Sequence, residues 1–190
     1  YDKMMNVFTW DAIRQDNYDV DYQNYYTFLG VLPQRELFVA TANALLKTGD
    51  KERALKVLDK CQESMPDHVW PLESIPLGFY TNDYMVVNMV SDYFAVGAPD
   101  KAADLGARLG KELLTTANFY MQFYEYAADD FERACQFLYY LIDELEKGGE
   151  KTVSHDLKLS LVAMMRSNIP DEEVAGYAPA DSSENTEIQK

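Results

Sequence analysis

The sequence contains only two cysteines, and their separation rules out the common thiol motifs. Cys61 and Cys135 are too far apart for a CxxC redox pair and match no zinc-ligand spacing. Each lies on the apolar stripe of an expected helix, where a free cysteine behaves as a small hydrophobic residue. We therefore expect two core thiols, and a disulfide between them is the alternative.

Long apolar runs and basic residues are also scarce. The longest strictly apolar run extends only from Phe137 to Ile142, whereas a bilayer-spanning helix needs roughly 18 to 20 such residues. The 17 basic residues against 32 acidic ones give a net charge of -15. Nucleic acids and anionic membranes bind clusters of Lys and Arg. We therefore expect no nucleic-acid partner and no direct insertion of this segment into a membrane.

No catalytic or metal-binding constellation can be recognised. His68 and His155 have no Cys, Ser or Asp at a spacing typical of a nucleophile or a metal site. An EF-hand loop starting at Asp19 would have Asn24 in place of the required glycine and Gly30 in place of the required glutamate. We expect no metal, no cofactor and no enzymatic activity in this segment, and an independent hydrolase is the weakest hypothesis.

Composition divides the chain into three parts. Residues 1–32 form an aromatic and acidic lead-in, with a loop expected around residues 16–21 because Asp and Asn compete for backbone hydrogen bonds. Residues 33–169 carry helical patterns. Residues 170–190 contain six acids, one lysine and few large apolar side chains, which predicts a disordered tail. The chain begins without an initiator methionine or a signal peptide, so we expect a piece of a larger protein.

The helical part opens with two helices joined by a short turn. Pro33 suits a first helical turn, and apolar and small residues then follow with helical spacing, at Leu37, Ala40, Thr41, Ala44 and Leu45. Gly49 and Asp50 break this helix. The second helix is expected from Lys51 until Pro66 ends it.

The spacing of these two helices resembles the 34-residue tetratricopeptide repeat, which has bulky, small, glycine and proline residues at fixed positions. Those positions are occupied by Phe38, Ala42, Leu45, Gly49, Ala54 and Pro66. The pattern returns around Gly97 and Ala102, after an insert over residues 67–82. That insert is rich in apolar residues, so we expect it to lie on the helices.

A third, weaker repeat is expected around Asp129 and Asp130, which would replace the turn, with Ala134 at the small position. A final amphipathic helix from Thr152 to Ser167 is expected to cap the open end of the stack. The sequence therefore predicts an all-α fold, a tetratricopeptide-like α-α superhelix of stacked antiparallel helical hairpins with a C-terminal capping helix.

Three segments, residues 1–10, 18–21 and 51–61, resemble the C-terminal soluble region of an uncharacterised bacterial family of multi-pass membrane proteins. The N-terminal part of that family is similar to glycosyltransferases of the protein O-mannosyltransferase type. The resemblance implies that this chain is an extracytoplasmic, periplasmic domain tethered to the inner membrane in a larger protein. It supplies no catalytic residue, because the membrane-embedded half is not in this sequence.

The 14 tyrosines and two tryptophans are an excess with two interpretations. Aromatic residues fill the cores of repeat proteins, and they also stack on sugar rings. Core packing is the favoured interpretation. Sugar binding would be detected as quenching of Trp10 or Trp70 fluorescence by a glycan.

We expect a non-catalytic binding or scaffolding module whose first helices line a concave groove for a protein or peptide. The alternative is an accessory domain of a membrane glycosyltransferase, which positions a sugar donor, a glycan or an acceptor protein. Repeat positions 2, 9, 12 and 13 of the first helices give the groove residues Glu36, Asn43, Lys47, Tyr84, Ser91 and Phe94.

Overall fold

The computed structural model describes residues 1–10, 13, 32–73 and 82–168. Within these ranges every regular element is a helix, which confirms the all-α prediction. The helices are α1 (Asp2–Asn6), α4 (Leu32–Lys47), α5 (Lys51–Ser64), α6 (Asn82–Val96), α7 (Pro99–Met121), α8 (Tyr124–Lys147) and α9 (Lys151–Asn168).

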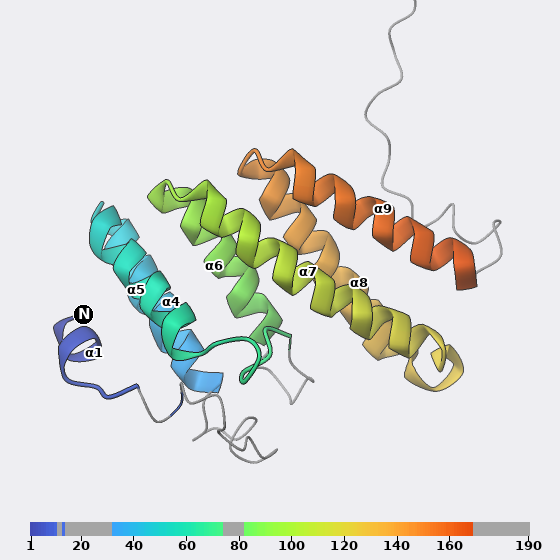
Figure 1. The fold of residues 1–190 in the computed structure, drawn as a ribbon, viewed down its shortest axis with the longest axis horizontal. Coiled ribbons are helices and arrows are strands. Elements are labelled where there is room, and N and C mark those ends of the chain that lie inside the picture. The colour runs from blue at the N-terminus through green and yellow to red at the C-terminus, as the bar shows by residue number, and fades with distance from the viewer. Residues whose placement is uncertain (11–12, 14–31, 74–81, 169–190) are drawn as a thin grey trace, which may run out of the picture.

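The long helices form three hairpins, α4–α5, α6–α7 and α8–α9, that stack side by side (Figure 1). The first helix of each hairpin packs on both helices of the preceding one, because α6 contacts α4 and α5, and α8 contacts α6 and α7. Two layers result, with α5, α7 and α9 in front of α4, α6 and α8 in Figure 1. The predicted tetratricopeptide-like stack of antiparallel hairpins is confirmed.

Each hairpin turns at a glycine in the left-handed region. The φ angles are +79° at Gly49, +91° at Gly97 and +88° at Gly149, a conformation that costs glycine nothing and other residues energy. The helix that follows is then capped differently in each hairpin. Asp50 accepts a hydrogen bond from the Arg53 amide in the first, and Pro99 opens α7 in the second.

The three second helices bury side chains at the same distances from these glycines. Five residues after each glycine comes a small buried residue, at Ala54, Ala102 and Ser154. The small size lets helices approach closely. Larger buried residues then recur on the same face, at Val57, Cys61 and Met65, at Leu105, Leu109 and Leu113, and at Leu157, Leu161 and Met165.

This register corrects the predicted third repeat. Asp129 and Asp130 lie inside α8, just after a break in that helix at Ala127, and α7 continues to Met121. An exposed or half-exposed aspartate is tolerated within a long helix whose other face is packed. The third turn is at Gly149, so α9, the predicted capping helix, is the second helix of the third hairpin. It closes the stack by covering α7 and α8.

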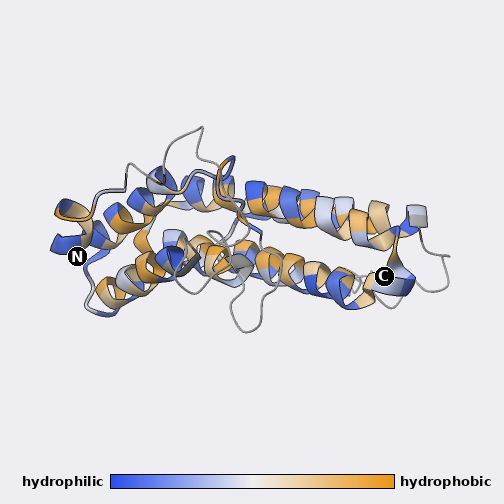
Figure 2. Ribbon diagram, turned by 90° about the horizontal axis from the view of Figure 1, so that it is seen from below, coloured by the Kyte–Doolittle hydropathy of each residue, from blue (hydrophilic) through white to orange (hydrophobic). Residues whose placement is uncertain are grey.

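The expected apolar face of the first long helix is also wrong in part. Leu37, Ala40 and Ala44 are exposed, whereas Phe38 and Ala42 are completely buried. The tetratricopeptide register therefore identifies the buried face of α4 correctly, and the simple helical periodicity does not. Figure 2 shows hydrophobic and hydrophilic residues alternating along each helix, as amphipathic packing requires.

The lead-in covers the first hairpin. Met4 and Trp10 are buried, and the Trp10 ring lies 4.7 Å from the Phe38 ring. The Trp10 indole donates its N–H to the Met4 carbonyl at 3.0 Å. Residues 1–10 thus belong to the packed domain rather than to a separate segment. The loop expected at residues 16–21 and the tail expected at residues 170–190 lie outside the described residues.

The first part of the insert lies on the helices, as predicted. Val69, Trp70 and Leu72 are buried. Two charged side chains from the helices hold its backbone. The guanidinium of Arg35 donates to the carbonyls of Trp70 and Pro71 at 2.8 and 2.9 Å, and it is itself almost completely buried.

On the other side, the Glu112 carboxylate of α7 accepts the backbone N–H groups of Leu72 and Glu73 at 2.8 and 2.9 Å. The insert therefore links α4 to α7 through residues 66–73, and residues 74–81 lie outside the described ranges. None of the helices in those ranges is both long enough and apolar enough to cross a lipid bilayer.

Candidate functional site

The six predicted groove residues all lie on first helices of the stack. Glu36, Asn43 and Lys47 belong to α4, and Tyr84, Ser91 and Phe94 belong to α6. Lys47 and Tyr84 are exposed, and the other four are half-buried. First helices form one layer of the stack (Figure 1), so these six residues belong to that layer.

The third hairpin adds residues that the sequence interpretation missed. Counted from Gly149, the same repeat positions in α8 are occupied by Gln136, Asp143, Glu146 and Lys147. They were missed because the third turn was expected at residues 129–130. The glycine at 149 followed by a small residue at 154 was the available signal, since it repeats the spacings of the first two turns.

Asn43 connects two hairpins. Its Nδ2 donates to Oδ2 of Asp92 on α6 at 3.2 Å and to the Val39 carbonyl at 3.1 Å. Asp92 is buried, and burial raises the pKa of its carboxyl to about 6. Asn43 therefore holds α4 against α6, and a ligand that used its amide would compete with this bond.

Asp92 makes the stability of the fold depend on pH. Because its pKa in the folded chain is above the ordinary value of 3.8, the folded chain holds the proton more tightly. The free energy of unfolding should therefore fall as the pH rises from about 4 to about 6, and stay lower above that.

The substitution Asp92→Asn removes this charge and keeps an oxygen that accepts from Asn43. We expect it to raise the free energy of unfolding by about 1–3 kcal/mol at pH 7.5, and to have little effect at pH 4. Urea unfolding at both pH values measures the difference. Asp156→Asn, at an exposed carboxylate of α9, is the control. Equal stability of Asp92→Asn and the unmodified chain at pH 7.5 would contradict this assignment.

Phe94 is also used between hairpins. A methyl group added at Gly148, at the end of α8, would lie only 2.4 Å from Cδ2 of the Phe94 ring. The ring therefore packs directly on the Gly148 backbone and fixes α8 against α6. Of the predicted residues on α6, Tyr84 is the one with a large exposed surface, at 51% of its side chain.

One hollow lies along the first helix α8. Its volume is about 630 Å³, and Gln136 lies at a groove position of the third hairpin. The Gln136 amide donates to the Tyr140 hydroxyl at 2.9 Å, which orders two exposed side chains. The hollow is lined by Asp129, Phe131, Glu132, Arg133, Cys135, Gln136, Tyr139 and Tyr140.

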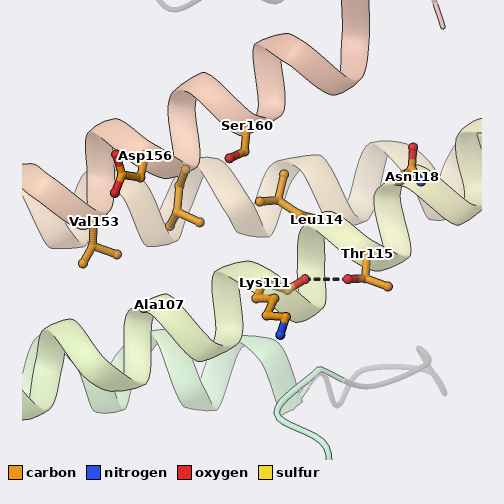
Figure 3. Close-up of a pocket in the computed structure, with 9 residues that line it drawn as sticks. Ala107, Lys111, Leu114, Thr115, Asn118, Val153, Asp156 and Ser160 are labelled. Atoms are coloured by element: carbon orange, nitrogen blue, oxygen red, sulfur yellow. Dashed lines mark hydrogen bonds between the residues drawn. The ribbon is translucent and has the colours of Figure 1, made fainter. Parts of the chain in front are cut away.

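A second hollow, of about 520 Å³, lies between the second helices α7 and α9. Figure 3 shows Lys111, Leu114 and Thr115 on one side and Val153 and Asp156 on the other. The Thr115 hydroxyl donates to the Lys111 carbonyl at 2.8 Å. Its small and mixed side chains give no arrangement typical of a particular ligand.

Neither cysteine thiol is a reactive group in this fold. Both cysteines are free and buried, as predicted for core thiols, and burial raises the pKa of each to about 12. A thiol with such a pKa is not a nucleophile at neutral pH. Among the described residues, no group of three or more His, Cys, Asp or Glu side chains could hold a metal ion.

Neither tryptophan is available to stack on a sugar. Trp70 is completely buried and donates its indole N–H to the Ile13 carbonyl at 2.5 Å, and Trp10 packs inside the lead-in. The structure thus supports core packing for both residues. Any aromatic contact with a ligand must come from exposed residues such as Tyr84 and Tyr140.

No family model matches the chain, and neither the curated proteins nor the solved structures contain a match to it.

Proposed function

We propose that this chain is a non-catalytic module that binds an extended peptide or a protein segment along its first helices α4, α6 and α8. The observation that carries the proposal is the common register of the three hairpins, which repeats the same surface positions on parallel helices. Such a surface presents side chains at regular intervals, as repeat proteins do when they bind extended partners.

The side chains at these positions, and Tyr140 beside them on α8, suit a peptide. Tyr84 and Tyr140 offer exposed rings, and Gln136, Ser91 and Lys47 offer polar groups that can bind a peptide backbone. Tyrosine contributes large contact area at a small cost in conformational entropy. The α8 end carries the acidic residues Asp129 and Glu132 beside the hollow, so we expect bound peptides to place basic residues there.

A selection from a displayed library of random 12-residue peptides tests this function. We expect the selected peptides to lose at least about tenfold in affinity for Tyr84→Ala and for Gln136→Ala, which corresponds to about 1.4 kcal/mol for each contact. Both residues lie on the surface, so neither change should affect folding.

Leu159→Ala is the matched control, because Leu159 is an exposed apolar residue on α9 outside the first-helix layer. Peptides that keep full affinity for both groove variants and lose it for Leu159→Ala would refute the groove. The resemblance adds a context to the proposal, in which the module serves a larger membrane protein from its extracytoplasmic side.

A further inference from the structure

The connection between α7 and α8 carries a group of aromatic residues that the groove does not use and of which Tyr120 packs partly against the core. We name it the aromatic tip, and it consists of Phe119, Tyr120, Phe123, Tyr124 and Tyr126. The side chain of Tyr126 is 89% exposed, that of Phe119 55% and that of Phe123 50%. A patch of large exposed aromatic side chains marks an interaction surface more often than chance.

The aromatic tip is nearly free of charge. Residues 119–126 contain a single ionisable acid or base apart from the tyrosine hydroxyls, at Glu125, in a chain of which 26% of residues are charged. The rings also contact one another, with Phe119 5.4 Å from Tyr120 and 5.3 Å from Phe123 between centroids. Phe119, Tyr120 and Phe123 therefore form one aromatic cluster, and the Tyr124 ring beside it contacts the buried Phe131 ring at 5.6 Å.

The position of the tip exposes it to large, flat partners. α7 has 23 residues and α6 has 15, so α7 extends about 12 Å further at 1.5 Å per residue. α8 is interrupted near its start by the non-helical residue Ala127, so the first turn of α8 belongs to the tip. Figure 1 shows the α7–α8 connection at one end of the molecule, away from α1, α4 and α5.

The backbone at the tip is already hydrogen-bonded. The amides of Gln122 and Phe123 donate to the carbonyls of Phe119 and Tyr120 at 3.1 and 2.9 Å. The amides of Tyr126 and Ala127 both donate to the Phe123 carbonyl, at 2.8 and 3.0 Å. This matters because an unsatisfied backbone group is costly at the edge of a hydrocarbon phase.

We propose that the aromatic tip docks at the interface of a zwitterionic lipid bilayer, with its rings at the level of the headgroups. Tyrosine and phenylalanine suit this layer, because the ring is apolar and the tyrosine hydroxyl remains in contact with water. The tip lies at one end of the stack (Figure 1) and has a satisfied backbone, which fits a soft planar surface. Docking of this kind needs no helix that crosses the bilayer.

The charge of the chain favours a zwitterionic bilayer over two other partners, a second copy of the chain and an anionic bilayer. The chain carries a net charge of -15, and Glu125, Asp129 and Asp130 lie at or beside the tip. These charges repel both a second copy of the chain and an anionic bilayer. The proposal therefore predicts a preference for zwitterionic over anionic lipid, which is opposite to the preference of basic peripheral proteins. It does not depend on the peptide groove, which lies on other residues.

Co-sedimentation with large vesicles of phosphatidylcholine tests the proposal. We expect the full chain to partition onto these vesicles, and Phe123→Ser combined with Tyr126→Ser to reduce the partition coefficient at least about tenfold, because two rings lose their burial. Vesicles in which a third of the lipid is phosphatidylglycerol should bind the chain less well at low salt.

Tyr84→Ser combined with Tyr140→Ser is the matched control, since both tyrosines are exposed and lie away from the tip. This control should bind vesicles as the unmodified chain does, and circular dichroism should show all chains equally helical. The proposal is overturned if the unmodified chain does not bind the vesicles, or if both double variants lose binding equally. Sedimentation that shows dimers dependent on Phe123 and Tyr126 would overturn it as well, in favour of a contact between copies.

Discussion

Trp70→Ala should lower the free energy of unfolding by about 4 kcal/mol, because it leaves a cavity the size of an indole ring beneath the insert. Trp70 is completely buried, and its N–H group donates to the Ile13 carbonyl. The loss thus includes a hydrogen bond between the insert and the lead-in. Denaturant unfolding followed by circular dichroism measures the effect.

Trp70→Phe separates the contribution of the cavity from that of the hydrogen bond. It keeps most of the apolar volume and removes the indole donor, so we expect a loss of about 1–2 kcal/mol. A loss for Trp70→Ala as small as that for an exposed residue such as Tyr126→Ala would mean that residues 66–73 are not packed on the helices in solution.

Arg35→Met should lower the free energy of unfolding by about 3 kcal/mol. The buried guanidinium satisfies the carbonyls of Trp70 and Pro71, and methionine fills a similar volume without a donor. The insert would then keep its apolar contacts and lose its attachment to α4. We expect this substitution to accelerate amide hydrogen exchange more in residues 66–73 than in α5.

Arg53→Met is the matched control for Arg35→Met. Arg53 is exposed and pairs with Asp50 at 2.5 Å, and exposed ion pairs of this kind contribute about 0–1 kcal/mol. Similar losses of unfolding free energy for the two arginine variants would contradict the role of Arg35 in attaching the insert to α4, because burial would then make no difference.

Much of the fold can be predicted from the glycine turns. Gly49 and Gly97 fix two hairpins, and the small residues five positions later identify the buried face of each second helix. Periodicity alone misleads in α4, because Leu37, Ala40 and Ala44 also have helical spacing but lie on the exposed side. Apolar residues on a solvent-facing stripe are common in folded proteins, so the turn is the more reliable guide.

The third hairpin was predictable in principle. Gly149 and Ser154 repeat the spacing, but the offset of 52 positions from Gly97 to Gly149 far exceeds a standard repeat. The extra length lies in α7 and α8, which run on to the aromatic tip. Asp129 and Asp130 resemble a turn at the expected distance, and local residue types favour a turn there. The chain turns a few residues earlier instead, between Met121 and Ala127, and this turn joins α7 to α8 rather than the two helices of one hairpin.

The roles of the groove residues could not be predicted from their positions. Asn43 and Phe94 occupy groove positions in the repeat pattern, yet Asn43 bonds Asp92 and Phe94 packs on Gly148. A repeat pattern gives the direction of a side chain and not the residue that the neighbouring hairpin places opposite it. Tyr84 and Lys47 remain exposed because no described neighbour covers them.

The common register of the three hairpins is the central claim, and nuclear Overhauser contacts between hairpins test it most directly. An added methyl at Gly110 of α7 would lie 2.5 Å from Leu157 of α9, and one at Gly106 2.8 Å from Leu145 of α8. We predict strong contacts from the Leu157 and Leu145 methyl groups to the α-protons of Gly110 and Gly106, and from the Phe94 ring to Gly148. A helical chain that lacks these contacts, or shows Leu157 beside a different turn of α7, would contradict the stacked register and the groove that depends on it.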